Sequence, residues 1–336
     1  MLSKRVLLEV DSGSSAHKTF RRRFAMLNRI AESLFWIGRY TERAENHARL
    51  IDAFYHIREE TADEDHLWIR MVRAVGDPTQ FETAQLAYRE QDVLFYVALD
   101  ASHSNSIHSC VQSTKTNLKT VRERLPEELW DIVNGFALWL RSGEADELLY
   151  ESPFLFLRKV KENMGMFYGA AQHMMFRDQQ WLIMESGRYL ERAENTARLL
   201  ESLHRSIADD ESRVSYYLFS AVRALGGVDV YRRLYSDHFT LEHTASLLIM
   251  NELFPRSVQH GLSGLEANLH TIRGMNGADP ALDKAIRLVV KARSELSWLD
   301  TSELAKGSLL NGMEAINQLG AAVGDAFFRA RQGVRA

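Results

Sequence analysis

One thirteen-residue segment occurs twice in this chain. Residues 38–50 read GRYTERAENHARL and residues 187–199 read GRYLERAENTARL, so eleven of the thirteen positions are identical. A motif that returns after 149 residues indicates a repeated structural unit, which restricts the fold to one that accommodates the same element twice. The segment is also strongly charged, so a fold must be found in which these charged side chains have suitable surroundings.

The correspondence extends beyond this motif. VRAVG at 72–76 matches VRALG at 222–226 with an offset of 150 residues, and GAA at 169–171 matches 320–322 with an offset of 151. A slow drift of the offset is what a few small loop insertions produce. We therefore predict an internally duplicated chain with two pseudo-symmetric halves of about 150 residues, in which the same surface of each copy faces the other.

The boundaries of the two copies follow from the same correspondence. We assign residues 26–177 to the first repeat and residues 178–336 to the second, packed with the first as one unit. The stretch before residue 26 contains DSGSSAHKTFRRRF and no helical periodicity, so we expect residues 1–25 to be a disordered N-terminal extension. Either Met1 or Met26 is then the true start.

The chain is expected to be all-α, a helical bundle. Strand signals are scarce, and apolar residues recur every three or four positions over long segments. Pro78, Pro153 and Pro280 each follow Asp or Ser, which is typical of a capped helix start. In the first repeat we predict helices over residues 28–60, 64–75, 79–100, 104–124, 127–141 and 153–176, with a similar series from about 178 to 332.

The charged segment is predicted to lie within a helix, where residues turn by about 100° each. Its apolar side chains then share one face, and its charged and amide side chains line the opposite face. The candidate site residues are Arg39, Glu42, Arg43, Glu45, Asn46 and Arg49 in the first copy and Arg188, Glu191, Arg192, Glu194, Asn195 and Arg198 in the second. Because a mid-helix glycine costs about 1 kcal/mol relative to alanine, Gly38 and Gly187 predict close approach of another backbone or a ligand.

Three roles are open for these side chains. They form a structural network of ion pairs between the halves, or a binding site for an anionic or zwitterionic ligand or partner peptide, or a catalytic or metal site. Arginine occurs at the same positions in both copies, which favours bidentate pairing that lysine cannot replace. We expect Arg43 and Arg192 to hold the helices together, and Arg39 and Arg188 to face an open cleft.

A metal site has the least support among these roles. Di-metal carboxylate bundles use histidine at the Glu-x-x-His spacing, whereas the third residue after Glu42 is Glu45. The neighbouring arginines would repel a cation, and His47 is replaced by Thr196 in the second copy. We therefore predict no metal. We also expect no cofactor, because the chain contains no Gly-rich phosphate loop, nucleophile elbow or dinucleotide fingerprint.

The charge balance and the cysteine content exclude further classes. The formal net charge is -4, whereas a general nucleic-acid binder usually carries a basic excess. No apolar run approaches the roughly 18 residues of a membrane-spanning helix, so we expect neither a nucleic-acid nor a membrane partner. Cys110 is the only cysteine, so no intramolecular disulfide can form, and a cytoplasmic location fits.

The stretch that begins at Met26, MLNRIAESLFWIGRYTERAENHARL, resembles the opening of the bacterial alpha-E domain family. The Glu-Arg motif of that family would be Glu42-Arg43 here and Glu191-Arg192 in the second copy, and the resemblance covers most of the chain from Met26 onwards. The family is all-helical and of unassigned function. The resemblance implies association with circularly permuted ATP-grasp-type ligases and transglutaminase-like peptidases, in a system that forms peptide or amide bonds.

Two functions from different classes follow from these observations. The first is a non-catalytic accessory or scaffold protein that partners an ATP-grasp-type ligase, since no pair of nucleophile and base is evident in the sequence. The alternative is an enzyme, an amide-bond transferase or hydrolase, in which buried Glu and Arg side chains of the cluster do the chemistry, because burial shifts carboxyl pKa values toward those of useful acids and bases.

Overall fold

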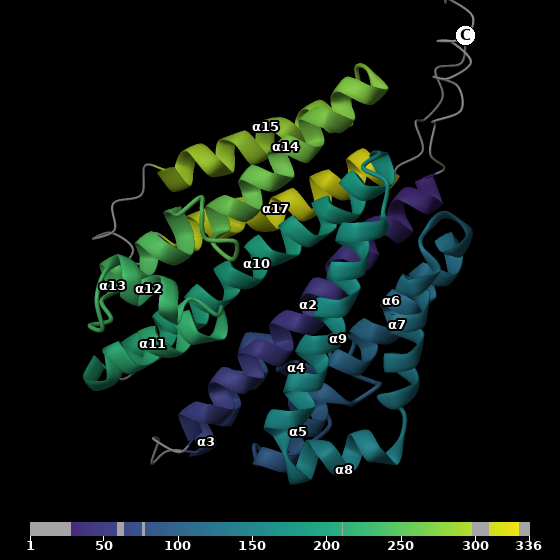
Figure 1. Ribbon diagram of the computed structural model, residues 1–336. Helices are drawn as coiled ribbons and strands as arrows, with labels where there is room; N and C mark the ends of the chain where they lie inside the picture. Colours follow the sequence, from purple (N-terminus) through teal and green to yellow (C-terminus); the bar gives the residue numbers. More distant parts are fainter. Residues whose placement is uncertain (1–27, 59–63, 76–77, 210, 298–308, 329–336) are drawn as a thin grey trace, which may run out of the picture.

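The computed structural model describes residues 28–58, 64–75, 78–209, 211–297 and 309–328, and within these ranges it is helical without any strand (Figure 1). The all-α prediction is confirmed. The expected extension, residues 1–25, lies outside the described residues. The helices of the first part are α2 (Asn28–Arg58), α3 (Glu64–Val75), α4 (Thr79–Thr83), α5 (Glu90–Ala98), α6 (Ile107–Val121), α7 (Glu127–Trp139), α8 (Gly143–Glu151) and α9 (Pro153–Met174).

The second part of the chain contains another set of helices and one short π-helix at Ser246–Met250. These helices are α10 (Gln179–Asp209), α11 (Val214–Ala224), α12 (Val228–Leu234), α13 (Leu241–Ala245), α14 (Val258–Asn276), α15 (Pro280–Ser297) and α17 (Leu309–Phe328). None of the described helices is both long and apolar enough to span a membrane.

The two motif helices, α2 and α10, form the centre of the molecule. Each has 31 residues, and they pack directly against each other. Both begin at the same end of the molecule and separate toward their C-terminal ends (Figure 1). Because they run in the same direction, equivalent positions of the two motifs come to lie opposite each other.

Glycine allows this close crossing. A Cβ atom built on Gly38 would lie 2.0 Å from the carbonyl oxygen of Met184, and one built on Gly187 would lie 2.2 Å from the carbonyl oxygen of Phe35. Real Cβ atoms do not approach backbone so closely, so any larger residue at either position would push the helices apart.

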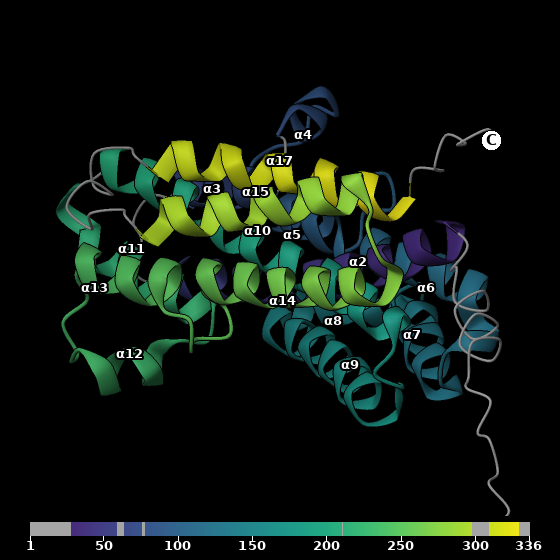
Figure 2. The ribbon, with the colours of Figure 1, turned by 90° about the horizontal axis from the view of Figure 1, so that it is seen from above.

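The other helices surround this pair in two groups. The helices α6 and α9 pack on α2, whereas α14 packs on α10 and α17 contacts both α10 and α15 (Figures 1 and 2). Near the C-terminal ends of the central pair, α3 contacts α10 and α11 contacts α2. The helix that follows each central helix therefore packs against the other central helix. The buried apolar side chains of the described residues form one continuous core through both groups.

Several local predictions differ from the structure. The expected helix over 79–100 is two helices, α4 and α5, because the chain turns at Gln85, whose φ is 53°. The helix α8 was not predicted. Pro153 does begin α9, but the Ser152 side chain makes no capping hydrogen bond. Asp279 does cap α15, since its Oδ1 accepts a hydrogen bond from the backbone N–H of Ala281 at 3.0 Å.

Candidate functional site

Two reciprocal ion pairs join the motif helices just beyond the glycine crossing. Arg43 on α2 donates Nε and Nη2 to the two carboxylate oxygens of Glu191 on α10, at 2.7 and 2.9 Å. Arg192 on α10 donates Nε and Nη2 to the two oxygens of Glu42 on α2, at 2.8 and 2.7 Å. Both carboxylates are completely buried. The Glu-Arg dipeptide of each helix therefore binds the Glu-Arg dipeptide of the other.

Arg39 extends the network on the Glu191 side. Its Nε donates to Glu191 at 2.5 Å, and its Nη2 donates to Glu194 at 2.5 Å. Gly320 on α17 leaves room for the Glu194 carboxylate, since a Cβ at this glycine would lie 3.2 Å from one of its oxygens. The prediction that Arg39 faces an open cleft is wrong, because its side chain is only 8% exposed and bridges two buried carboxylates.

Arg256 completes the network on the Glu42 side, and the sequence analysis missed it. This residue lies just before α14, far from either motif in the sequence. Its Nη2 donates to Glu45 at 2.6 Å, and its Nη1 donates to the side-chain oxygen of Asn46 at 2.6 Å and to Glu42 at 3.2 Å. It thus gives Glu45 an arginine partner, as Arg39 does for Glu194.

The position 151 residues before Arg256 also lies beside a motif arginine, although it holds a different residue. An offset of 151 residues relates Arg256 to Asn105, and Asn105 accepts a hydrogen bond from Nη1 of Arg43 at 2.9 Å. On the other side, Nη1 of Arg192 donates to the carbonyl oxygen of Pro255 at 3.2 Å. The loop before α6 and the loop before α14 therefore each contact the arginine of a Glu-Arg dipeptide, but with different chemical groups.

Arg188 does not occupy the position that Arg39 takes in the other half. It donates Nε to Glu185 on its own helix at 2.8 Å, and its guanidinium lies over the rings of Tyr168 and Tyr189. The prediction of an open cleft at Arg188 is also wrong, since the guanidinium pairs with Glu185 and packs on two aromatic rings, which leaves 18% of the side chain accessible. Glu185 and Tyr168 were not among the predicted site residues.

The remaining predicted residues surround the four central ones. The side chains of Asn46 and Asn195 each donate to the glutamate one turn earlier, Glu42 and Glu191, at 3.2 Å. Arg49 donates to Glu45 at 2.8 Å, and Arg198 donates to Asn195. Arg49 and Arg198 are the more exposed members of the network, with 31% and 40% of their side-chain surface accessible.

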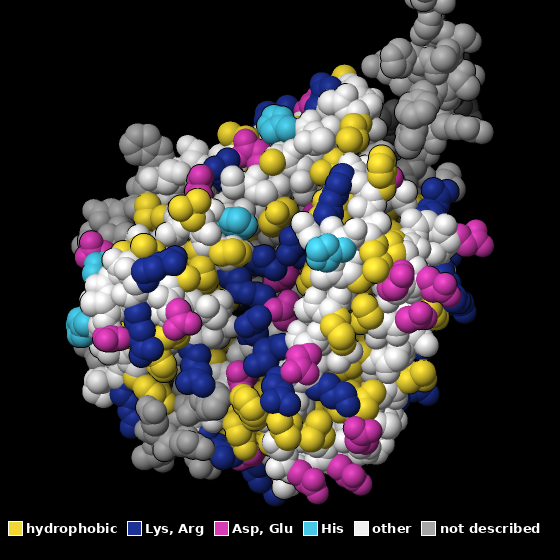
Figure 3. Space-filling model, viewed as in Figure 1, with side chains coloured by type: hydrophobic (Ala, Val, Ile, Leu, Met, Phe, Trp, Pro, Cys, Tyr) yellow, Lys and Arg dark blue, Asp and Glu magenta, His cyan; other side chains and the backbone are white. Residues whose placement is uncertain are grey.

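The network reaches the surface as a set of arginines. Arg49, Arg188 and Arg256 lie on the Glu42 side of the central pair, and each keeps part of its side chain accessible. We call these three residues the arginine band. Figure 3 shows a line of Lys and Arg side chains along the middle of one face, where the part that holds α9 meets the part that holds α11 to α13.

The carboxylates at the centre are ionised. Burial alone would raise the pKa of Glu42, but the positive charges of Arg192 and Arg256 outweigh it and lower the pKa to about 2. Burial likewise opposes ionisation of Glu191, and Arg39 and Arg43 overcome it, so that its pKa also falls below the usual range. Glu194 differs, because burial dominates there and raises its pKa. Neither central carboxylate can therefore act as a general acid near neutral pH.

Two other titratable groups nearby, Cys110 and His47, also have strongly shifted pKa values. Burial raises the pKa of the Cys110 thiol to about 12, so the nucleophilic thiolate is not formed near neutral pH. Burial and the charge of Arg43 lower the pKa of His47 to about 3. In the described part of the chain, no group of three or more His, Cys, Asp and Glu side chains is arranged to hold a metal ion.

The buried His47 makes the stability of the protein sensitive to acid. Its pKa is lower in the folded chain, so between pH 6.5 and about 3 the unfolded chain binds the extra proton. The contribution of neutral His47 to the free energy of unfolding is therefore fully present above pH 6.5. It decreases as the pH falls, by about 2–3 kcal/mol at pH 4.5. Denaturant unfolding of wild type and His47→Gln at pH 7.5 and 4.5 measures this; the variant is expected to lose less stability than wild type over that interval. An equal loss in both would show that His47 is not responsible.

These features define a class of protein: an all-helical unit held by two long helices that cross at glycine and exchange Glu-Arg pairs. The family model described as "Alpha-E: a predicted alpha-helical domain with a conserved ER motif" matches residues 26–328. The chain therefore belongs to the Alpha-E family. The Glu42-Arg43 and Glu191-Arg192 dipeptides are two occurrences of the Glu-Arg sequence in this chain, and they bind each other.

The chain is also similar to uncharacterised proteins of mycobacteria. It is 25% identical over 269 residues to one from Mycobacterium tuberculosis strain H37Rv and, to the same degree, to one from Mycobacterium bovis. The match covers 74% of this chain but only 30% of each relative, so the chain spans less than a third of their length. No solved structure matches the chain.

Proposed function

We propose that this chain is a non-catalytic helical scaffold that partners an ATP-grasp-type ligase in a system that forms peptide or amide bonds. The observation that carries the proposal is the state of the Glu/Arg cluster. Its central carboxylates are buried, ionised and paired with arginines of the opposite helix. Such a cluster fixes the relative position of two helices, and it does not offer the free acid, base or nucleophile that an enzyme requires.

The partner class comes from the family resemblance, which implies a circularly permuted ATP-grasp-type ligase and a transglutaminase-like peptidase. In the mycobacterial relatives the matched region makes up 30% of a longer polypeptide. A rigid module that forms part of longer polypeptides is suited to hold other parts of such a system in place.

We further infer that the two halves are copies of one ancestral unit. The Glu-Arg pairs are reciprocal between positions about 150 residues apart, and both crossing glycines touch the backbone of the other helix. A duplicated unit explains why the same dipeptide serves as donor and acceptor on both helices.

The arginine band is the surface to which we assign the partner. Arg49, Arg188 and Arg256 are partly accessible at the junction of the halves, where they would attract an acidic segment of the ligase. Arg256 is the most crowded of them, since burial and the nearby charges of Arg192 and Arg49 lower its pKa. An added negative charge would relieve this crowding.

Co-purification tests the scaffold function. We expect the tagged chain to recover a co-expressed ATP-grasp-type ligase from the same genome, because the band attracts it. Arg49→Ala is expected to reduce recovery several-fold, whereas Lys119→Ala, an exposed change on α6, is expected to leave it unchanged. Recovery of each variant is measured after its folding has been verified by circular dichroism.

Two outcomes would contradict the proposal. One is no association between the two proteins with or without ATP. The other is turnover of a peptide or amide substrate by the isolated chain that disappears in Glu42→Gln while the variant stays folded. This second outcome would establish the enzyme alternative, with Glu42 as its working group.

A further inference from the structure

Two equivalent glutamates of the motif helices have arginine partners of different origin. Glu194 on α10 pairs with Arg39, which reaches it from the opposite motif helix at 2.5 Å. Glu45 is the counterpart of Glu194 at an offset of 149 residues, and its arginine partner from outside its own helix is Arg256, at 2.6 Å. The counterpart of Arg39 at the same offset is Arg188. The repeat therefore relates Arg188 to Glu45 as it relates Arg39 to Glu194.

The geometry of the crossing places Arg188 near Glu45. The two glycines approach the opposite backbone to nearly the same extent, since their Cβ positions lie 2.0 and 2.2 Å from a carbonyl oxygen of the other helix. The guanidinium of Arg188 lies 5.0 Å from the centre of the Tyr168 ring. Burial raises the pKa of the Tyr168 hydroxyl, and the charges that act on it include those of Arg188 and Glu45. Both groups therefore lie close to the same side chain.

Arg188 also has a donor that its present partner does not use. Its Nε and Nη2 both donate to Glu185, whereas its Nη1 makes no hydrogen bond with the residues that the structure describes. Arg39 shows that one guanidinium of this network serves two carboxylates at once. Arg188 can therefore donate Nη1 to Glu45 and keep Glu185 paired.

The side chain of Arg256 can leave without movement of its backbone. Thr196 donates its hydroxyl to the carbonyl oxygen of Arg256 at 2.8 Å, and Arg192 donates Nη1 to that of Pro255 at 3.2 Å, so the loop is held on α10. Burial and the nearby charges of Arg192 and Arg49 lower the pKa of Arg256. When it turns outward, its guanidinium recovers hydration and loses this repulsion, which offsets part of the lost pairing.

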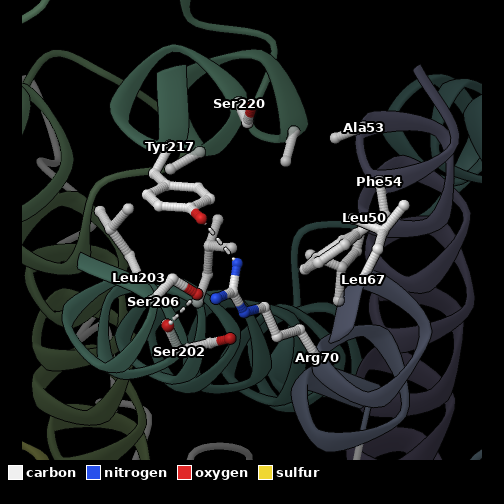
Figure 4. A pocket seen from close by; sticks show the side chains of 13 residues that line it. Leu50, Ala53, Phe54, Leu67, Arg70, Ser202, Leu203, Ser206, Tyr217 and Ser220 are labelled. Carbon is white, nitrogen blue, oxygen red and sulfur yellow. Dashed lines mark hydrogen bonds between the residues drawn. The ribbon is translucent and has the colours of Figure 1, made fainter. Parts of the chain in front are cut away.

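The far end of the central pair offers Glu45 no replacement for Arg256. Beyond the Glu-Arg pairs, α2 and α10 separate around a pocket lined mainly by leucine, alanine and phenylalanine side chains. The arginine in this lining, Arg70, is directed toward the hydroxyl of Tyr217 on α11 (Figure 4). A second partner for Glu45 therefore has to come from the side of the glycine crossing, where Arg188 lies.

We propose that Glu45 has two alternative arginine partners, Arg256 in the present structure and Arg188 when the side chain of Arg256 turns out to solvent. In the second arrangement Glu45 and Glu194 are each paired with the arginine that follows the glycine of the opposite helix. The exchange is a property of the chain alone. Its use rests on the scaffold function proposed above, because an acidic segment at the arginine band would take up Arg256 without depriving Glu45 of a partner from the opposite helix.

A crystal structure of Arg256→Met tests the exchange directly. We expect a guanidinium nitrogen of Arg188 within about 3.2 Å of a Glu45 carboxylate oxygen, with Glu185 still paired. An unchanged Arg188, with Arg49 as the only arginine at Glu45, would overturn the proposal. A variant that does not fold would also overturn it, because a second partner for Glu45 should preserve the fold.

A double-mutant cycle of Arg188→Met and Arg256→Met, followed by denaturant unfolding, provides an independent test. Arg188→Met should raise the unfolding equilibrium constant about tenfold more in the Arg256→Met background than in wild type, because Glu45 has then lost both partners. Repulsion between the two arginines would give coupling of the same sign. The cycle is therefore repeated in Glu45→Gln, which lacks the shared carboxylate, and the coupling should then fall below about twofold.

Arg158→Met is the matched control, since it removes an exposed arginine that pairs with Glu162 on its own helix. Its effect on the unfolding equilibrium constant should be the same in wild type and in Arg256→Met. Equal effects of Arg188→Met in both backgrounds, or coupling that persists in Glu45→Gln, would contradict the exchange. Where Arg188→Met fails to fold, the crystal structure of Arg256→Met alone decides the question.

Discussion

Gly38→Ala and Gly187→Ala are each expected to destabilise the protein by about 3 kcal/mol or more. The added Cβ of either variant would lie 2.0–2.2 Å from a backbone carbonyl oxygen of the opposite helix. A backbone carbonyl within a helix cannot rotate away as a flexible side chain can, so α2 and α10 would have to move apart. This movement would also lengthen the Glu-Arg hydrogen bonds that begin one turn further along. The loss is measured by denaturant unfolding.

Gly165→Ala provides the matched control for these variants. Gly165 also lies within a long helix, α9, but a Cβ there meets no atom within 4 Å. Alanine is the better helix former, so this change is expected to stabilise the protein by about 0.5–1 kcal/mol. A similar small gain at Gly38 or Gly187 would mean that the two helices do not approach as closely as described.

Much of the fold could be predicted from the sequence, because its central element occurs twice. The position of Gly38 and Gly187 in both motifs indicated a close approach, and the structure places each glycine against the backbone of the other helix. Helical periodicity located most elements. It failed between α4 and α5, since apolar residues continue at helical spacing through the turn at Gln85, where the backbone leaves the helical region.

The candidate site was harder to predict, for physical reasons that particular residues show. Arg39 was assigned to a cleft because it adjoins Gly38, which predicted the close approach of another backbone or a ligand. The glycine instead brings the helices so close that Arg39 must lie against Glu191 and Glu194. Arg256 could not be found from either motif, since it contacts Glu42 across 214 residues of sequence and is brought there only by the packing of α14.

The asymmetry between the halves also escaped sequence reasoning. Identical motifs predict identical contacts, yet Arg39 binds Glu194 of the opposite helix whereas its counterpart Arg188 binds Glu185 of its own. The difference arises outside the motif, because Arg256 already occupies Glu45. The surroundings of a repeated segment therefore decide which of its charges pair.

Arg192→Met is expected to cost about 3–5 kcal/mol of stability, because it leaves the buried carboxylate of Glu42 without its bidentate partner. Glu42 keeps only the hydrogen bonds from Arg256 and Asn46, each at 3.2 Å and both to the same oxygen, which is too little for a fully buried charge. The control is Arg158→Met on α9, which removes an exposed arginine 3.4 Å from Glu162 and should cost less than about 1 kcal/mol. Both losses are measured by denaturant unfolding at pH 7.5.

A double-mutant cycle separates the value of the pair from the penalty of an unpaired charge. Glu42→Met alone leaves the Arg192 guanidinium buried and without its carboxylate, so it should cost about as much as Arg192→Met. In the double variant both charges are gone and two flexible apolar side chains fill the space, so the total loss should be smaller than the sum by about 2 kcal/mol or more. Losses that simply add, or an Arg192→Met loss no larger than that of Arg158→Met, would show that the Glu-Arg exchange does not hold the helices together. The partner proposal would then lose its rigid support, since Arg256 of the band binds Glu42.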